Sequence, residues 1–302
     1  MTGDRTGRAV AAAVTAGRNL GLDVRHGAVL HDVFSVVVHL QPEPVVARVP
    51  VVLTSSARPE QQSVRQQREL DVAAWLHDQG VPVVPPSPLV PRRPVRRDGF
   101  SMTFWELADL APDHEPYRGA GMSYSAALHA ALAGYPGELP FLGPFNDGLP
   151  EMLEHLGTVD LLTVAEIDRA RDEFADLREM LSDRAAFAAA FGGIAVQPLQ
   201  GDAPSHNVIR TTSGIRFSDF EDVTSGPVEW DLALLEADAV AEYDAAARRR
   251  GMRTNDPQVR TTMDRARRLQ FIGCLTLIPQ LPVLAQGLSE VLAQWRAQVG
   301  SP

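Results

Sequence analysis

Residues 199–209 read LQGDAPSHNVI, and residues 217–221 read FSDFE. Asp202 stands five positions before Asn207, and Asp219 follows at the end of an apolar, strand-like run. A loop that leads into a hairpin can bring these three side chains to one point. One carboxylate could then accept a proton, while the amide oxygen and the other carboxylate hold Mg²⁺ against phosphate groups. A turn at Asp202 and a cap at Asn207 would explain the same spacing without any chemistry.

Further motifs follow in a fixed order, and this order is more specific than any single motif. Together they resemble the aminoglycoside phosphotransferase family, a branch of small-molecule kinases with the protein-kinase-like fold. The resemblance is strong in the central third of the chain and looser in the N-terminal part. It rests on Gly201-Asp202, Asn207, Asp219-Phe220, Gly226-Pro227 and Asp231-Leu232-Ala233.

The resemblance implies a role for each of these polar residues. Asp202 is expected to be the catalytic base, and Asn207 and Asp219 are expected to ligate Mg²⁺. Asp231 is expected to be structural and to brace the catalytic loop through hydrogen bonds. A solvated acid near a helix start is the other interpretation of Asp231.

Two residues depart from the family pattern. Gln200 stands where the family has a histidine before Gly-Asp, and glutamine can also donate and accept hydrogen bonds. Glu221 stands where protein kinases have glycine, so Glu221 or Asp222 is a further candidate for metal binding. Neither departure removes a group that phosphoryl transfer requires.

The kinase resemblance also requires a cation on a strand of the N-terminal part, paired with an acid on the next helix. All 28 basic residues are arginine, so this cation cannot be lysine. Arg48, in VVARVP, is the candidate for holding the α- and β-phosphates, and an outward-facing strand residue is the alternative. Glu69 is the preferred acidic partner, with Glu60 as its competitor.

Two other segments are candidates for nucleotide contacts. The turn region at 30–36 contains Ser35, which could donate to a phosphate, although a plain hairpin turn fits equally well. The backbone from Trp105 through Glu106 to Leu107 could hydrogen-bond a purine base. The Trp105 side chain itself is expected in the core.

Hydrophobic periodicity predicts an α+β fold with a small antiparallel sheet followed by a larger helical part. The resemblance makes this a protein-kinase-like fold of two lobes. Residues 1–106 are predicted to form the nucleotide-binding lobe, and residues 107–302 the catalytic and substrate-binding lobe. The elements expected are a helix at 8–20, strands at 24–30, 34–40 and 44–50, a helix at 59–79, extended segments near 86–97 and 100–107, a capped helix from Thr163, a second helix at 184–193, and a hairpin at 208–220.

Composition limits the classes of function. The net charge of -10 argues against binding nucleic acid or anionic membranes, and it would attract cationic small molecules. The single cysteine, Cys274, excludes an internal disulfide and fits a reducing, cytoplasmic compartment. The most apolar late stretch contains two prolines and is too short to span a bilayer.

The sequence therefore predicts an ATP- or GTP-dependent O-phosphotransferase with Mg²⁺ as cofactor. Its acceptor would be a hydroxylated small molecule: an aminoglycoside or other antibiotic, a sugar or an amino-alcohol. Candidates for lining the site of a cationic substrate are the loop at 141–152 and the acidic residues Glu229, Asp231, Glu236 and Asp238, although a solvated acidic helix face explains these acids as well. The alternative is a kinase-like binding protein that has lost catalysis.

Overall fold

A computed structural model describes residues 2–54 and 59–298 of the chain. The chain forms two compact units, each built from two segments. The first unit consists of Met1–Gly119 and His206–Glu221, and the second of Ala120–Ser205 and Asp222–Pro302. These units divide the chain at other positions than the predicted lobes, since the segments 107–119 and 206–221 belong to the unit that contains the sheet. The functional lobes with a boundary at residue 106 stay a prediction.

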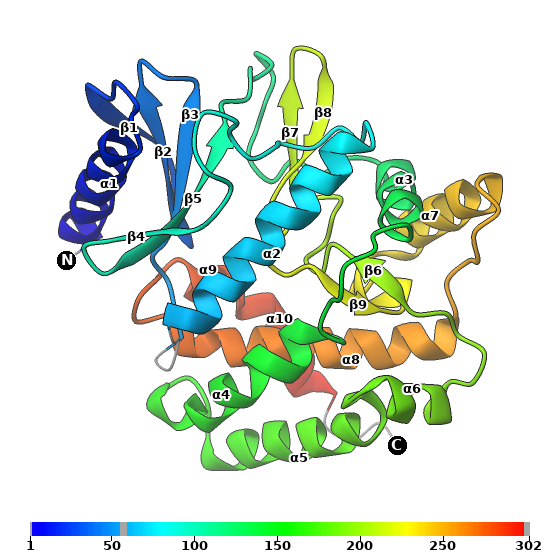
Figure 1. Cartoon of the computed structure of the whole chain (residues 1–302). Helices are drawn as coiled ribbons and strands as arrows, with labels where there is room; N and C mark the ends of the chain where they lie inside the picture. The colour runs from blue at the N-terminus through cyan, green and yellow to red at the C-terminus, as the bar shows by residue number, and fades with distance from the viewer. Residues whose placement is uncertain (1, 55–58, 299–302) are drawn as a thin grey trace. The chain divides into compact units, whose positions relative to one another are not determined.

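The first unit is built on a five-stranded antiparallel sheet with the order β1-β2-β3-β5-β4 (Figure 1). β3 lies in the middle and is paired on both sides, which suits its run of β-branched residues. Its strands are β1 (His26–Asp32), β2 (Ser35–Gln41), β3 (Val45–Pro50), β4 (Val95–Arg97) and β5 (Phe100–Glu106).

Helix α1 (Thr2–Asn19) covers one face of this sheet with a stripe of small residues. Ala9, Ala12, Ala13 and Ala16 recur at helical spacing and are almost fully buried. They belong to one core with alternate residues of β3, including Ala47. The helix begins earlier than the sequence indicates, since its first turn is polar and carries no hydrophobic signal.

Strand alternation turns Arg48 away from the face that α1 covers. On that other face it meets helix α2 (Pro59–Asp78), which carries Glu69. The first unit also contains a hairpin of β7 (Val208–Thr211) and β8 (Gly214–Phe217). A bridge between Val83 and Phe217 joins this hairpin to the chain that follows α2.

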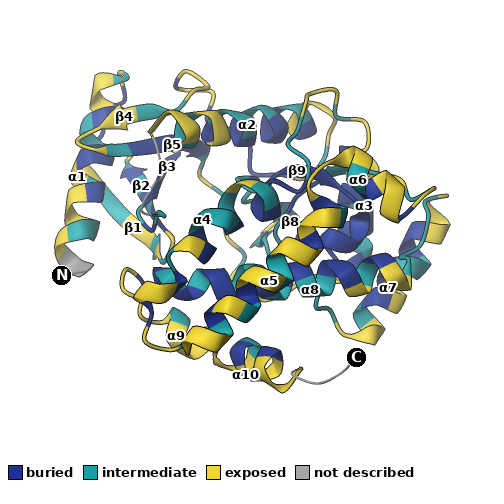
Figure 2. Ribbon diagram, turned by 90° about the horizontal axis from the view of Figure 1, so that it is seen from below, coloured by how far each residue is buried: buried dark blue, intermediate teal, exposed yellow. Residues whose placement is uncertain are grey.

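The second unit is mainly helical, and its core contains the buried rings of Phe145, Trp230, Tyr243 and Trp295. Figure 2 shows α8 buried along much of its length, whereas α5 shows an exposed side. Its α-helices are α3 (Met122–Leu132), α4 (Leu149–Glu154), α5 (Val164–Leu181), α6 (Arg184–Ala190), α7 (Ala237–Arg249), α8 (Pro257–Gly273), α9 (Leu284–Gly287) and α10 (Ser289–Ala297). Shorter helical turns are η1 (Pro144–Gly148), η2 (Leu156–Thr158), η3 (Val228–Trp230) and η4 (Cys274–Leu277).

The second unit also contains a short antiparallel strand pair, β6 (Gln197–Leu199) and β9 (Thr224–Gly226). Neither strand is predicted from the sequence, because each has three residues and β6 contains a proline. β6 leads directly into the loop of Asp202. The structure thus confirms the predicted α+β class and adds one strand pair to it.

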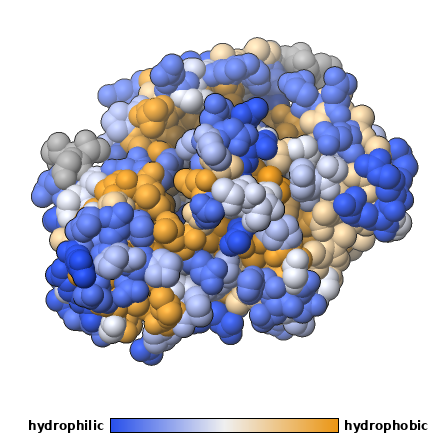
Figure 3. All heavy atoms as spheres, turned by 90° about the horizontal axis from the view of Figure 1, so that it is seen from above, coloured by the Kyte–Doolittle hydropathy of each residue, from blue (hydrophilic) through white to orange (hydrophobic). Residues whose placement is uncertain are grey.

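The described surface mixes polar and apolar side chains. Figure 3 shows hydrophobic residues reaching the surface between hydrophilic ones. The exposed large apolar residues include Val29, Leu30 and Phe34 near the turn between β1 and β2. Among the described residues, no helix is both long enough and apolar enough to cross a membrane.

Candidate functional site

Arg48 is the centre of a charged cluster within the first unit. Its Nη2 atom lies 2.9 Å from Oδ1 of Asp219, and its Nη1 atom lies 2.6 Å from Oε2 of Glu221. Nη1 also lies 3.4 Å from both carboxylate oxygens of Glu69. The strand, the helix and the segment after the hairpin therefore supply one arginine and three carboxylates to one place.

The sequence left Glu69 and Glu60 as rival partners of Arg48, and the geometry separates them. The Glu69 side chain is 1% exposed and faces Arg48. Glu60 is 80% exposed and lies 3.9 Å from Arg96 instead. Glu69 is thus the residue placed to orient Arg48, and the use of this pair for nucleotide binding stays a prediction.

The protonation of the cluster follows from burial and from the short contacts. Burial acts to lower the pKa of Arg48, but Asp219, Glu221 and Glu69 outweigh it and raise that pKa well above its ordinary value. Burial raises the pKa of Glu69 to about 8, against the opposing effect of Arg48. Burial also acts to raise the pKa of Glu221, but Arg48 and Arg65 hold it at about 2. Glu221 is therefore the more firmly ionised of the two glutamates.

The β7–β8 hairpin positions the two predicted metal ligands in the same unit. The ladder continues past the strands, because the amide of Ser218 donates to the carbonyl of Asn207 at 2.9 Å. Asp219, the next residue, has a left-handed backbone with φ of 57°. Aspartate tolerates this conformation better than most residues. Asn207 is therefore tied through its carbonyl to the residue before Asp219.

These two side chains fit a divalent cation of the Mg²⁺ type. An amide oxygen and a carboxylate are hard oxygen donors, and Mg²⁺ takes few protein ligands and completes its shell with water and phosphate. Among the described residues, no group of three or more His, Cys, Asp or Glu side chains forms a metal cage. The donor set suits an ion shared with phosphates rather than an ion enclosed by protein.

In the second unit, the loop after β6 presents Asp202 with its side chain about half exposed. The buried side chain of Gln200 accepts a hydrogen bond from the Asp202 amide at 2.9 Å. Gly201 has φ of 91°, and a Cβ atom there would collide with the carbonyl of Asp222. Glutamine thus performs a loop-orienting role at the position where the family has histidine.

Asp231 braces this loop through hydrogen bonds, as the sequence analysis expected. Its carboxylate accepts from the amides of Gln200 at 3.1 Å and Gly201 at 2.9 Å. A third contact joins Asp231 to Nε2 of His129 at 3.0 Å, and Nδ1 of His129 lies 2.8 Å from the hydroxyl of Tyr243. His129 was missed by the sequence analysis, because a lone histidine in an apolar helix carries no distinguishing signal.

The loop is also held through the main-chain carbonyl of Gly201, which accepts two side-chain hydrogen bonds. Trp230 Nε1 and Arg267 Nη2 donate to the carbonyl of Gly201 at 3.0 and 2.9 Å. The Arg267 guanidinium lies over the Trp230 ring, 4.1 Å from its centroid, and its Nη1 atom lies 4.0 Å from Oδ1 of Asp202. Arg267 is a second residue that the sequence did not reveal.

Three of the features proposed to line the acceptor site are instead part of the packing of the second unit. Glu229 is fully buried and forms a two-point ion pair with Arg253 at 2.6 and 2.7 Å. The charge of Glu229 is therefore compensated by a partner within the second unit. Asp231 is likewise buried, and its carboxylate accepts hydrogen bonds from the loop of Asp202. The loop at 141–152 is largely helical and buries Leu142, Phe145 and Leu149 in the core. Packing, rather than substrate contact, explains these residues.

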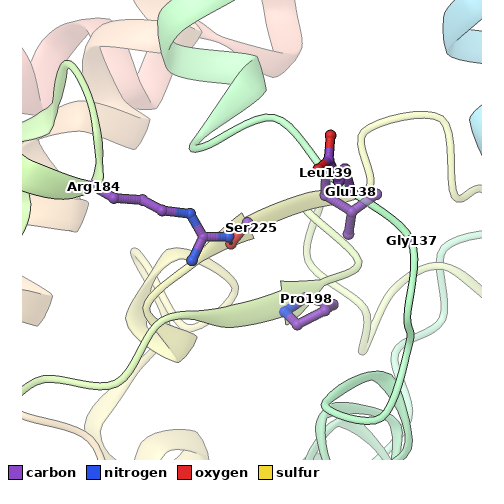
Figure 4. Close-up of a pocket in the computed structure, with 6 residues that line it drawn as sticks. All are labelled: Gly137, Glu138, Leu139, Arg184, Pro198 and Ser225. Carbon is purple, nitrogen blue, oxygen red and sulfur yellow. Dashed lines mark hydrogen bonds between the residues drawn. The ribbon is translucent and has the colours of Figure 1, made fainter.

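A cavity of about 320 Å³ lies beside the β6–β9 pair of the second unit. Figure 4 shows the Arg184 side chain directed toward Ser225, and its Nη2 atom donates to the Ser225 hydroxyl at 2.6 Å. The cavity therefore carries one guanidinium and one carboxylate, that of Glu138. Its lining consists of Gly137, Glu138, Leu139, Arg184, Pro198 and Ser225.

The candidate nucleotide contacts are less open than the sequence suggested. Ser35 is buried at the start of β2, opposite Pro50. The Trp105 ring is in the core, with Nε1 donating to Thr103 Oγ1 at 2.8 Å. The amides of Glu106 and Leu107 donate to the carbonyls of Pro85 and Pro44, both at 3.1 Å. The roles of Ser35, Glu106 and Leu107 in nucleotide binding stay predictions.

Comparisons with known proteins bear on the family and the fold of this chain. A model of the phosphotransferase enzyme family, APH, matches residues 29–269. The comparison with curated protein sequences gives no match.

Solved structures match over most of their length at low identity. The aminoglycoside phosphotransferase APH(3'')-Id from Streptomyces rimosus, in complex with ADP and streptomycin, is 17% identical with a TM-score of 0.53, and the match covers 85% of this chain and 97% of that one. The microcompartment-associated aminopropanol kinase is 16% identical, with a TM-score of 0.58 and 88% of both chains covered. A mutant aminoglycoside 2'-phosphotransferase-IIIa in complex with GDP is 14% identical, with a TM-score of 0.60 and 95% and 98% covered.

The structural likenesses show the fold, and the family match spans well over half of the chain. The chain belongs to the phosphotransferase enzyme family, APH.

Proposed function

We propose that this chain transfers the γ-phosphate of ATP or GTP to a hydroxyl of a small molecule. The observation that carries the proposal is the Arg48 cluster, in which a strand guanidinium is held by Glu69 of the neighbouring helix and reaches Asp219. A kinase needs a fixed cation for the α- and β-phosphates beside a carboxylate that can hold the metal. The family match and the solved kinase neighbours support this interpretation.

Each group would have a defined part in the reaction. Asn207 and Asp219 would hold Mg²⁺, which supplies charge neutralisation at the β- and γ-phosphates when bound. Arg48, oriented by Glu69, would bind the phosphates that do not react. Asp202 would orient the acceptor hydroxyl and take its proton.

The bond changes follow from these roles. The acceptor oxygen bonds to the γ-phosphorus, the bond from that phosphorus to the bridging oxygen breaks, and the nucleoside diphosphate leaves. The hydroxyl proton passes to the carboxylate of Asp202. Because the transition state of phosphoryl transfer is loose, positioning and charge neutralisation provide most of the catalysis.

The acceptor would be a hydroxylated molecule that carries an amine. Two neighbours are an enzyme solved with streptomycin and an aminopropanol kinase, and both names fit this class. The net charge of -10 favours cationic acceptors through long-range attraction. Solved complexes with ADP and with GDP keep both donors open.

A substrate panel tests the proposal. Nucleoside diphosphate release is measured with ATP and with GTP against aminoglycosides, amino-alcohols and sugars. Acceptor-dependent release with at least one pair is expected. A binding protein without catalysis would instead bind nucleotide and release no diphosphate with any acceptor, and that result would contradict the proposal.

A further inference from the structure

Glu221 links two arginines that come from different elements of the first unit. Its Oε2 atom lies 2.6 Å from Nη1 of Arg48 on β3, and its Oε1 atom lies 3.6 Å from Nη2 of Arg65 on α2. The main-chain carbonyl of Glu221 also accepts from Nε of Arg65 at 3.0 Å. The carboxylate therefore has one close partner and one more distant partner.

The two arginines sit in different surroundings. Arg48 is 13% exposed, whereas Arg65 is 47% exposed. Arg65 stands one helical turn before Glu69, so both residues lie on the same side of α2. A carboxylate released by Arg48 would remain beside Arg65 and in contact with solvent, so it would not become a buried, unpaired charge.

The terminal nitrogens of Arg48 are already engaged. Nη1 contacts Glu69 and Glu221, and Nη2 contacts Asp219. A phosphate that binds Arg48 needs N–H groups of the same guanidinium, which offers a planar fork with a fixed number of donors. The 2.6 Å contact makes Glu221 the nearest of the three carboxylates and thus the main competitor for these groups.

We propose that Glu221 competes with nucleotide phosphates for Arg48, and that Arg65 is the alternative partner which receives Glu221 when nucleotide binds. The exchange would set the affinity of the chain for its nucleotide. The inference rests on the proposed function, in which Arg48 holds phosphates. It gives Glu221 a role opposite to that of a metal ligand, because a competitor weakens nucleotide binding.

Two substitutions should act in opposite directions. Glu221→Gln removes the competing charge, so nucleotide should bind more tightly, roughly tenfold. Arg65→Gln removes the alternative partner and leaves Glu221 on Arg48, so nucleotide should bind several-fold more weakly. The double variant should behave like Glu221→Gln alone, because without the competitor the alternative partner has no effect.

The test is calorimetric titration of the full chain with ADP and GDP, first in EDTA and then in Mg²⁺. EDTA separates the competition at Arg48 from any contact with a metal. Glu60→Gln is the matched control for Glu221→Gln, since it also removes one negative charge. Glu60 lies at an exposed site on α2. Thermal melts of all variants without nucleotide check that each variant is folded.

The outcomes separate this inference from the proposed function. Tighter binding by Glu221→Gln in EDTA, with the opposite change in Arg65→Gln, supports the exchange. Unchanged nucleotide affinity of Glu221→Gln in EDTA, or weaker binding by this variant that is seen only in Mg²⁺, overturns the exchange. In either case the proposed function stands as long as the wild-type chain binds nucleotide. A folded wild-type chain that binds neither nucleotide overturns both.

Discussion

Glu69 is a buried carboxylate, and its burial gives it a high proton affinity against the opposing effect of Arg48. Burial raises its pKa to about 8, whereas an unfolded glutamate titrates at about 4.3. The folded state thus binds the proton more tightly, so this group stabilises the fold most below about pH 4.3 and loses that contribution as the pH rises toward 8. Glu69→Gln, which does not ionise, should gain stability relative to wild type between about pH 5 and 8.

Denaturant unfolding of both proteins across this pH range checks the prediction for Glu69. A stability difference that is constant with pH would contradict it.

Gln200 holds the loop of Asp202 through a hydrogen bond from the Asp202 amide to its side-chain oxygen at 2.9 Å. Gln200→Ala would leave the Asp202 amide without its side-chain acceptor and remove a buried side chain. We expect kcat to fall roughly tenfold or more with a smaller change in the KM for nucleotide, because the loop carries the proposed base. Gln200→His should recover most of the activity. Equal activity of the alanine variant would show that the backbone alone fixes the loop.

At single positions, the sequence predicts what a motif or a spacing encodes. Arg48, Asp202, Asn207 and Asp219 could be proposed as site residues, because their expected chemistry is tied to short motifs and to the element that carries them. Arg65 and the ion pairs of Glu221 were not found, since they depend on how a helix face meets the segment after the hairpin. That meeting is a tertiary contact and leaves no local pattern.

Helix α5 begins with a capping box whose acid is also an ion-pair partner. Glu166 accepts from the amide of Thr163 at 2.8 Å and from Nε of Arg296 at 2.6 Å. The bond from Arg296, followed by that from Thr163, lowers the pKa of Glu166 to about 2. Its folded pKa is below the unfolded value, so its contribution is present above about pH 4.3 and is lost as the pH falls toward 2.

Glu166→Gln should therefore cost roughly 1 kcal/mol of stability at neutral pH, after allowance for solvent screening. The difference from wild type should shrink as the pH falls below about 4. Urea unfolding at neutral and acidic pH measures it. A difference that persists unchanged at acidic pH would assign the effect to packing instead of charge.

Among the elements, long periodic segments were predictable and short ones were not. Clear local signals predict α2, with Pro59 at its start and Gly80 just after its end, and the capped start of α5. No such signal predicts β6 and β9, whose three-residue strands are held by pairing across a sequence separation of about 25 residues. Burial of Glu229 was also not predictable, since its partner Arg253 lies beyond a helix.

For the molecule as a whole, the account predicts that a divalent metal is needed for turnover and not for folding. Asp219 is paired with Arg48 in the structure, so the charge of this carboxylate has a partner without an ion. EDTA should abolish diphosphate release, and the melting temperature without nucleotide should change little. Restoring Mg²⁺ should restore turnover. Turnover that persists in EDTA would remove Asn207 and Asp219 from the proposed roles.

The central claim is that Asp202 activates a hydroxyl for attack on a nucleotide held by the Arg48 cluster. The most direct measurement follows a radiolabelled γ-phosphate from nucleotide to acceptor in wild type and in Asp202→Asn, with nucleotide affinity measured in parallel. The account predicts labelled acceptor from wild type, a loss of roughly a thousandfold in Asp202→Asn, and nearly equal nucleotide affinity. Label transfer by Asp202→Asn at the wild-type rate would contradict it.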